Sequence, residues 1–337
     1  PFEFTYVSTF AGCGGSSLGY KWAGGRGVLA VEFDANAAAT YRANFKTPVL
    51  EKDICKVTAE EVMQLTGLKV GELDVLDGSP PCQGFSTAGK RQIHDPRNSL
   101  FIEFVKLIEG LQPKVFVMEN VSGMVKGKMK YVFAEIMRCL KATGYTVRCQ
   151  LLNAMYFNVP QSRERLIWIG VRQDLVAKGL GPQFPKAQGK PVTVREAFAQ
   201  TDDRDAPALP DWLAAAAKLM EAGNYSGANA EKAFMQVRGK SAGAINTKLL
   251  AWDRVSCTVV KSEISSTGLI HPDRKRYCSI GEMKVLNSFP QDFKFIGERK
   301  NAVERMGNCV PPRFMQAIAE TVRDTVLIPA DALQQQK

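Results

Sequence analysis

The first half of this chain alternates short apolar runs with helical patterns, and this alternation restricts the fold more than any other feature. Apolar runs typical of buried strands occupy residues 4–10, 28–32, 49–53, 73–76, 115–118, 147–152 and 166–171. Patterns typical of helices lie between them, at residues 36–45, 100–111 and 131–140. Strands that alternate with helices pair in parallel, so the pattern predicts an α/β fold with a doubly wound, mostly parallel sheet.

The character of the sequence changes after about residue 172. Stretches rich in Gly, Pro or polar residues follow at 179–191, 202–210 and 224–229, and only 212–222 looks firmly helical. Regular patterns return at 279–289 and 312–327. The predicted organisation is a first lobe over residues 1–172, completed by about 300–328, a smaller loop-rich lobe over 173–299, and a C-terminal tail over 329–337.

Chemically useful side chains follow five of the predicted strands. In an open α/β sheet, ligands bind outside the carboxyl ends of the strands, so we expect these side chains to line one cleft. The five segments are Phe10-Ala11-Gly12, Glu32-Phe33, Asp53-Ile54, Pro80 to Gln83, and Glu119-Asn120.

The segment FAGCGGSSLG at 10–19 is a glycine-rich turn that enters a predicted helix. Gly12 and Gly14 allow a tight turn and a close approach to a ligand, and Glu32, about 20 residues downstream, can accept hydrogen bonds from ribose hydroxyls. The glycine spacing departs from the GxGxxG pattern of many nicotinamide-binding enzymes. The glycine loop and Glu32 therefore indicate a site for a cofactor that carries a ribose. The alternatives for the loop are the binding of a nicotinamide cofactor and a simple packing turn.

Cys82 lies in GSPPCQGFS at 78–86, directly after an apolar run, and Glu119 ends a second run about 37 residues later. A nucleophile and an acid at the ends of buried strands indicate covalent catalysis, although a lone cysteine is more often an inert buried thiol. Arg163 and Arg165 alternate, so on a strand they would share one face and could hold the Glu119 carboxylate. The alternative for both arginines is a solvated strand face.

The net charge of +10 and the pI near 9.2 favour a polyanionic partner such as nucleic acid. Eight cysteines without a CxxC pair, and two distant histidines, argue against a zinc site. No apolar run reaches membrane-spanning length, and no signal peptide opens the sequence, so we expect a cytoplasmic protein with reduced thiols.

Five motifs occur in a fixed order along nearly the whole chain: FAGCGGSSLG, GSPPCQGFS, ENV at 119–121, QSRER at 161–165 and GNCVPP at 307–312. Together they resemble the DNA (cytosine-5)-methyltransferase family of bacterial or phage type. The resemblance implies a Rossmann-like lobe that transfers a methyl group from S-adenosylmethionine to C5 of a flipped-out cytosine and releases S-adenosylhomocysteine. In this reading Cys82 adds to C6, Glu119 acts at N3, and Arg163 and Arg165 supply cationic donors.

The resemblance also implies a cofactor pocket. Phe10 and Phe33 would flank the adenine, Glu32 would hold the ribose, and Asp53 would hold the adenine amino group. Pro80 and Leu100 would line the pocket, and Asn308 and Val310 would close it from the far end of the chain. The remaining members of the predicted pocket are Ala11, Gly12, Gly14, Gly15 and Ile54.

The implied partner is double-stranded DNA, bound without a metal or a membrane by a protein that we expect to be a monomer near the nucleoid. The basic loop at 84–98 is suited to closing over DNA, although a solvated surface loop is the simpler alternative. The region after QSRER, about 171–277, would recognise the target. The predicted DNA contacts are Ser86, Lys90, Arg91, Arg97, Arg238 and Arg254.

Three other functions remain alternatives. A tRNA cytosine methyltransferase of the same fold usually carries a Cys-Phe-Thr tripeptide after ENV, which this chain lacks. A catalytically silent DNA-binding relative would not need Cys82, Glu119 and both arginines. In a nicotinamide oxidoreductase, the PPCQ motif would have no function.

Overall fold

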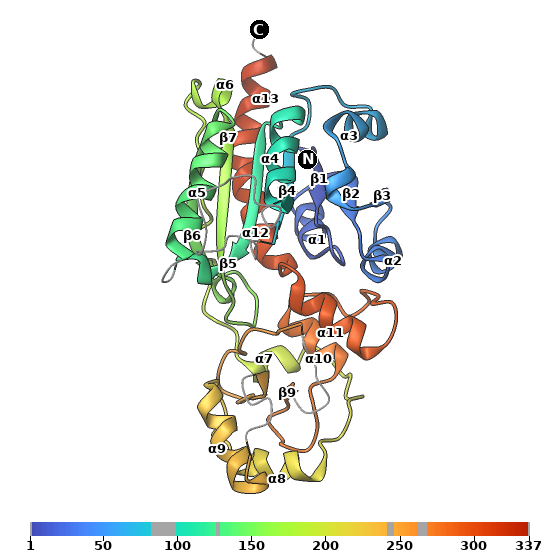
Figure 1. The fold of residues 1–337 in the computed structure, drawn as a ribbon, viewed down its shortest axis with the longest axis vertical. Helices are drawn as coiled ribbons and strands as arrows, with labels where there is room; N and C mark the ends of the chain where they lie inside the picture. Colours follow the sequence, from blue (N-terminus) through green and yellow to red (C-terminus); the bar gives the residue numbers. More distant parts are fainter. Residues whose placement is uncertain (1, 82–98, 126–128, 241–245, 262–267, 336–337) are drawn as a thin grey trace. The chain divides into compact units, whose positions relative to one another are not determined.

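The computed structural model describes residues 2–81, 99–125, 129–240, 246–261 and 268–335 (Figure 1). The chain forms two compact units, each made of separate stretches of sequence. Unit 1 contains Pro1–Leu152, Glu164–Lys186 and Met315–Lys337, and unit 2 contains Asn153–Arg163 and Ala187–Phe314. The predicted lobe boundary at residue 172 falls inside a stretch of unit 1, and the predicted tail at 329–337 contains most of a helix, α13 (Ile328–Gln335).

Unit 1 is built on a seven-stranded sheet with the order β3-β2-β1-β4-β5-β7-β6. Strands β1 to β5 pair in parallel, whereas β7 runs antiparallel to β5. The predicted mostly parallel, doubly wound sheet is confirmed. The strands are β1 (Phe4–Thr9), β2 (Gly25–Glu32), β3 (Val49–Glu51), β4 (Val75–Gly78), β5 (Val115–Val121), β6 (Tyr145–Asn153) and β7 (Glu164–Arg172).

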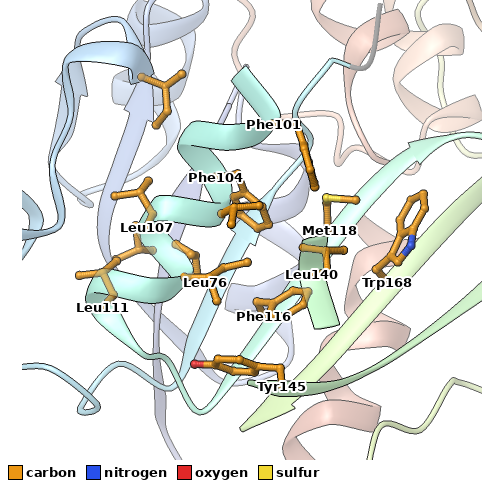
Figure 2. Packing of buried hydrophobic residues seen from close by; sticks show 14 of the residues in the cluster. Leu76, Phe101, Phe104, Leu107, Leu111, Phe116, Met118, Leu140, Tyr145 and Trp168 are labelled. Carbon is orange, nitrogen blue, oxygen red and sulfur yellow. The ribbon is translucent and has the colours of Figure 1, made fainter. Parts of the chain in front are cut away.

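One face of this sheet carries a large apolar core, shown in Figure 2. Helix α4 (Ser99–Leu111) places Phe104 and Leu107 against Leu76 of β4 and Phe116 of β5. The Phe104 and Phe116 rings meet edge to face, with their centroids 6.3 Å apart. Each such buried side chain stabilises the fold by about 1.5–3 kcal/mol. Helices α3 (Ala59–Thr66) and α5 (Met129–Ala142) contribute to the same core.

The opposite face of the sheet contacts α1 (Gly15–Trp22). Alternate residues of a strand point to opposite faces, so Tyr6 of β1 faces away from the core that holds Val7. The Tyr6 ring stacks on Tyr20 of α1, with the centroids 4.9 Å apart. Arg323 donates a hydrogen bond of 2.7 Å to the carbonyl oxygen of Ala23, which joins the C-terminal region to the end of α1. The other elements of unit 1 are α2 (Ala35–Asn44), η1 (Ile54–Lys56), η3 (Ser122–Val125), α6 (Gln173–Val176), the π-helical turn η6 (Arg323–Leu327), and α12 (Pro312–Val322), which begins in unit 2.

The described residues of unit 2 form short helices and one small parallel pair of strands. Helix α8 (Asp211–Leu219) matches the predicted helix at 212–222, and it packs with α9 (Gly227–Arg238) around Phe234. The prediction of a loop over 224–229 was wrong at its end: α9 begins at Gly227, and the Ser226 hydroxyl caps it by accepting from the Asn229 N–H. The other elements are η4 (Ala154–Tyr156), α7 (Val194–Phe198), β8 (Lys248–Leu249), β9 (Leu269–Ile270), α10 (Ile280–Leu286) and α11 (Arg299–Asn308).

Within the residues that the structure describes, no helix has both the length and the apolar character needed to cross a membrane.

Candidate active site

The parallel strands of unit 1 end at one edge of the sheet, which is where ligands bind in folds of this kind. The pairing fixes the levels of the strands: Ser8 of β1 lies beside Ala30 of β2 and beside Asp77 of β4, and Asp77 lies beside Val117 of β5. The structure therefore brings four of the five predicted site segments to this edge, at the ends of β1, β2, β3 and β5. Of the fifth, after β4, Pro80 and Pro81 are described.

The glycine loop after β1 has an unusual backbone. Phe10 adopts φ 53°, a left-handed conformation that non-glycine residues rarely take, and Gly12 and Gly14 follow at φ 55° and 96°. A Cβ on Gly14 would approach the Phe45 ring to 2.3 Å, so this position excludes any side chain. Among the described residues, no atom beyond the chain neighbours of Gly12 lies within 4 Å of the corresponding position on Gly12, so that space is open. Backbone strain of this kind concentrates at functional sites.

The Glu32 carboxylate holds this loop to the end of β2. Its Oε2 accepts the Gly12 N–H at 2.7 Å and its Oε1 accepts the Asp34 N–H at 2.8 Å. Each carboxylate oxygen has a second lone pair, so Glu32 retains capacity for a ligand hydroxyl. The neighbouring Phe33 ring is 76% exposed, which is unusual for a large aromatic side chain and leaves a flat apolar face beside the carboxylate.

The other predicted cofactor residues surround the same edge or lie in unit 2. Asp53 caps η1 by accepting the Cys55 N–H at 3.0 Å, and Ile54 is buried in the core. Leu100, at the start of α4, is half-buried. Asn308 is exposed at the end of α11 and Val310 is buried, both in unit 2. Acidic acceptors, an exposed ring and an open glycine loop fit an adenosine-bearing cofactor.

Glu119 and Arg165 form a partly buried ion pair at this edge. Arg165 Nε lies 2.6 Å from Glu119 Oε1, and the two side chains are 13% and 10% exposed. Antiparallel pairing of β5 with β7 places Arg165 beside Val121, two residues beyond Glu119. A charge-assisted contact this short fixes the Glu119 carboxylate in one position.

Arg163 has different partners from those predicted. Strand β7 begins at Glu164, so Arg163 precedes the strand and does not alternate with Arg165 on one face, as the sequence suggested. Its buried guanidinium donates to the carbonyl oxygens of Val259 at 3.1 Å, Gly307 at 2.8 Å and Cys309 at 2.9 Å. These contacts give Arg163 a structural task, which is to hold the GNCVPP segment within unit 2.

Several predicted residues lie outside the described part of the chain or already have protein contacts. The former are Cys82, Ser86, Lys90, Arg91 and Arg97. The Arg238 guanidinium carbon lies 4.4 Å from the centroid of the Trp212 ring, and Arg254 Nη1 donates to the Gly223 carbonyl at 3.2 Å. Among the described residues, no cluster of His, Cys, Asp or Glu could hold a metal ion.

Sequence reasoning missed Asp77 and the contact made by Asn120. Asp77 is buried on β4, and burial raises the pKa of its carboxyl group to about 7. The Asn120 side-chain amide donates to the Pro80 carbonyl at 2.8 Å, joining the end of β5 to the segment after β4. The sequence did contain a signal for a buried acid, because Asp77 is the one charged residue in the apolar run VLDG.

Residues 4–324 match the family model of C-5 cytosine-specific DNA methylases. The Type II methyltransferase M1.HphI of Haemophilus parahaemolyticus is 35% identical over 337 residues, which cover 95% of this chain and 87% of that protein. The Type II methyltransferase M.Sau96I of Staphylococcus aureus is 32% identical, with 95% and 76% covered.

Solved structures share the fold at lower identity. A prophage-encoded Escherichia coli protein superposes with a TM-score of 0.70 at 22% identity, over 96% of this chain and 99% of that one. A mutant of Spodoptera frugiperda DNMT2 gives 0.69 at 19% identity, over 95% and 98%.

Proposed function

This chain belongs to the C-5 cytosine-specific DNA methylase family, and from that membership we propose how its own residues carry out the reaction. The family methylates C5 of cytosine in DNA and uses S-adenosylmethionine as the methyl donor. We assign the nucleophile to Cys82, the acid to Glu119, and the group that holds the acid to Arg165.

The ion pair between Glu119 and Arg165 is the observation that carries this assignment. It places a fixed carboxyl group at the ligand-binding edge of the sheet, at the end of β5. Strand β4, which leads to Cys82, runs parallel beside β5 with Gly78 level with Met118. The Asn120 amide holds the Pro80 carbonyl just before the nucleophile. A nucleophile and an acid delivered by adjacent strand ends suit covalent catalysis.

The chemistry explains why these residue types are required. C5 of cytosine is a poor nucleophile while the ring is aromatic. The Cys82 thiolate forms a bond to C6, the C5–C6 double-bond electron pair moves to C5, and Glu119 shares a proton with N3 to neutralise the developing charge. When bound, S-adenosylmethionine supplies an electrophilic methyl group for C5. Loss of the C5 proton to a base then breaks the bond between sulfur and C6, which restores the aromatic ring and the thiolate.

The residues around the glycine loop would hold the cofactor. Glu32 would accept the ribose hydroxyls while it retains the N–H groups of Gly12 and Asp34. The exposed Phe33 ring would stack on the adenine with Phe10 on its other side. Asp53 would accept from the adenine amino group. Pro80 and Leu100 would complete the part of the pocket that unit 1 supplies.

We also propose separate functions for two regions of the chain. Residues 1–172 would carry the chemistry and about 173–299 would recognise the target. The net charge of +10 supports binding to double-stranded DNA through phosphate contacts, and such binding weakens steeply with salt. The target base must leave the duplex to reach Cys82, as for other enzymes that modify bases. The protein would act as a cytoplasmic monomer.

A trapping experiment tests the reaction. DNA that contains 5-fluorocytosine blocks release of the C6 adduct, because fluorine replaces the proton that must leave. Wild type with S-adenosylmethionine should give a denaturant-resistant protein–DNA band, and Cys82→Ser should give none while keeping the fold. A band from Cys82→Ser would refute the assignment. Transfer of tritiated methyl to tRNA instead of DNA would favour the tRNA alternative.

A graft tests target recognition. Residues 172–277 from a relative with a different target word should transfer that word to this chain, as read by bisulfite sequencing of the product. A chimera that still methylates the original word would place recognition elsewhere.

A further inference from the structure

Asp77 lies on β4 directly beneath the ligand-binding edge of unit 1. Its neighbours across the strands are Ser8 and Val117, and these three side chains point to the same face of the sheet. Two residues further along β5, on that same face, lies Glu119. Asp77 is therefore one side-chain level below the proposed acid, on the strand that leads to Cys82.

Two hydroxyl groups hold the Asp77 carboxyl. Ser8 Oγ donates to Oδ2 at 3.0 Å, and the Tyr20 hydroxyl donates to Oδ1 at 3.3 Å. We call Ser8, Tyr20 and Asp77 the carboxyl clasp. It joins three elements: β1, which enters the glycine loop; α1, which leaves it; and β4, which leads to the nucleophile.

An acid at this position is costly for the fold. Asp77 is only 2% exposed, and burial raises the pKa of its carboxyl to about 7. The titratable groups that face it are Tyr6 on β1, Tyr20 on α1, Tyr41 on α2 and Glu119 on β5. A buried apolar side chain would fill the same space without the desolvation penalty, so packing does not explain the acid.

We propose that Asp77 is a positioning residue for methyl transfer. It fixes the position of β4, which leads to Cys82, relative to α1, which follows the glycine loop. The inference rests on the proposed function. Asp77 does not need to contact the DNA or S-adenosylmethionine, because it acts through β4 and α1.

The charged form of Asp77 is the one that matches the clasp. As a carboxylate, it accepts both hydroxyl hydrogens, one on each oxygen. When protonated, it must donate on one oxygen, and either Ser8 or Tyr20 must turn its hydrogen away. The clasp is therefore complete above the pKa of Asp77 and altered below it. Small displacements of reacting groups lower rates steeply, so methyl transfer should respond to this change.

The test compares kcat for DNA methylation in wild type and Asp77→Asn across about pH 5.5 to 8.5, on either side of the Asp77 pKa. The ratio of the two rates cancels ionisations that both proteins share, including that of Cys82. We expect the ratio to rise roughly tenfold with a midpoint near neutral pH. Dissociation constants for S-adenosylmethionine, measured by calorimetry, should differ by less than about threefold, because the clasp acts on placement and not on cofactor contacts.

Asp74→Asn is the matched control. Asp74 precedes β4 and accepts from the Thr5 N–H at 2.7 Å and from Lys114 Nζ at 2.7 Å, so its loss disturbs a comparable acid–donor network away from the site. The rate ratio for this control should not change with pH. A flat ratio for Asp77→Asn, or the same pH dependence in Asp74→Asn, would overturn the inference.

Tyr20→Phe keeps the proposal testable if Asp77→Asn does not fold. It removes one donor to the carboxylate and keeps the ring that stacks on Tyr6. Because that hydrogen bond lowers the pKa of Asp77, its loss should move the rate midpoint to higher pH. An unmoved midpoint would contradict the inference. A wild type that forms no Cys82 adduct would instead refute the proposed function, so the two failures are distinguishable.

Discussion

The side-chain amide of Asn120 donates a hydrogen bond of 2.8 Å to the carbonyl oxygen of Pro80. Both residues are buried, and the bond crosses from the end of β5 to the segment that follows β4. Its position gives it two expected effects. It satisfies a buried carbonyl, and it fixes the backbone two residues before Cys82.

Asn120→Ala removes this bond. We expect a loss of about 1 kcal/mol in the free energy of unfolding, because a buried hydrogen bond is removed. We also expect kcat to fall by roughly tenfold or more through misplacement of the loop. Asn44→Ala is the control, because the Asn44 amide also donates to a backbone carbonyl, that of Thr40, at 2.8 Å, but away from the site. Equal effects on kcat would contradict the assignment.

Arg165→Ala should nearly abolish methyl transfer. The change leaves the Glu119 carboxylate buried without its cation, which typically costs about 3–5 kcal/mol. Single-turnover rates and urea unfolding measure the two consequences. Arg42→Ala is the control: Arg42 pairs with Glu51 at 2.8 Å, but those side chains are 47% and 37% exposed, so at most about 1 kcal/mol should be lost. Full activity of Arg165→Ala would show that the ion pair between Glu119 and Arg165 is not required for methyl transfer.

Glu32→Ala should weaken S-adenosylmethionine binding by about 1.5–3 kcal/mol, the usual value for hydrogen bonds to a charged acceptor. Calorimetry with S-adenosylmethionine and with NAD provides the measurement. Glu51→Ala, at the end of the neighbouring strand, is the control and should bind the cofactor as wild type does. Tight NAD binding without S-adenosylmethionine binding would contradict the cofactor assignment.

The stability of the cofactor-free protein should depend on Asp77 through pH. The pKa of Asp77 is raised from its ordinary value of 3.8 to about 7 in the folded state, because burial disfavours the charged carboxylate. The folded protein therefore binds more protons than the unfolded chain between these values. The contribution of Asp77 is therefore fully present below pH 3.8 and is lost as pH rises through about 7. The limiting slope is about 1.4 kcal/mol per pH unit.

Thermal unfolding detects this slope by comparison with Asp77→Asn, which cannot titrate. Relative to the variant, the wild type should lose stability between about pH 5 and pH 7 and then level off. Parallel Tm curves for the two proteins would show that Asp77 does not titrate in this range.

The strand pattern was predictable because parallel strands buried on both faces produce continuous apolar runs. Val115 to Met118 is such a run, and all four residues are buried. The strands also predicted the shared edge, since parallel strand ends meet there. The start of α9 was not predictable from composition, because Gly227 and Asn229 are typical of loops. The Ser226 cap and the hydrogen bonds between the Asn229 side chain and the Glu221 backbone stabilise them in a helix.

The partners of individual side chains were harder to predict. Arg163 and Arg165 differ by two positions, yet Arg165 pairs with a carboxylate and Arg163 holds backbone carbonyls 96 to 146 residues away. Strand β7 begins at Glu164, between the two arginines, so Arg165 lies on the strand and Arg163 precedes it. The role of Asp77 was not predictable from its apolar run, because its two partners come from β1 and α1. A local sequence pattern gives no information on contacts between residues 57 or more positions apart.

Unit 1 includes residues from both ends of the sequence, and this has a consequence for synthesis on the ribosome. Residues 315–322 of α12 belong to unit 1, and Ile318 and Val322 are buried there. A nascent chain that has not yet reached this stretch lacks part of the apolar cover of unit 1. Unit 1 therefore completes its fold last, after the residues of unit 2 have been translated, and a prematurely terminated chain would expose apolar surface to chaperones and proteases.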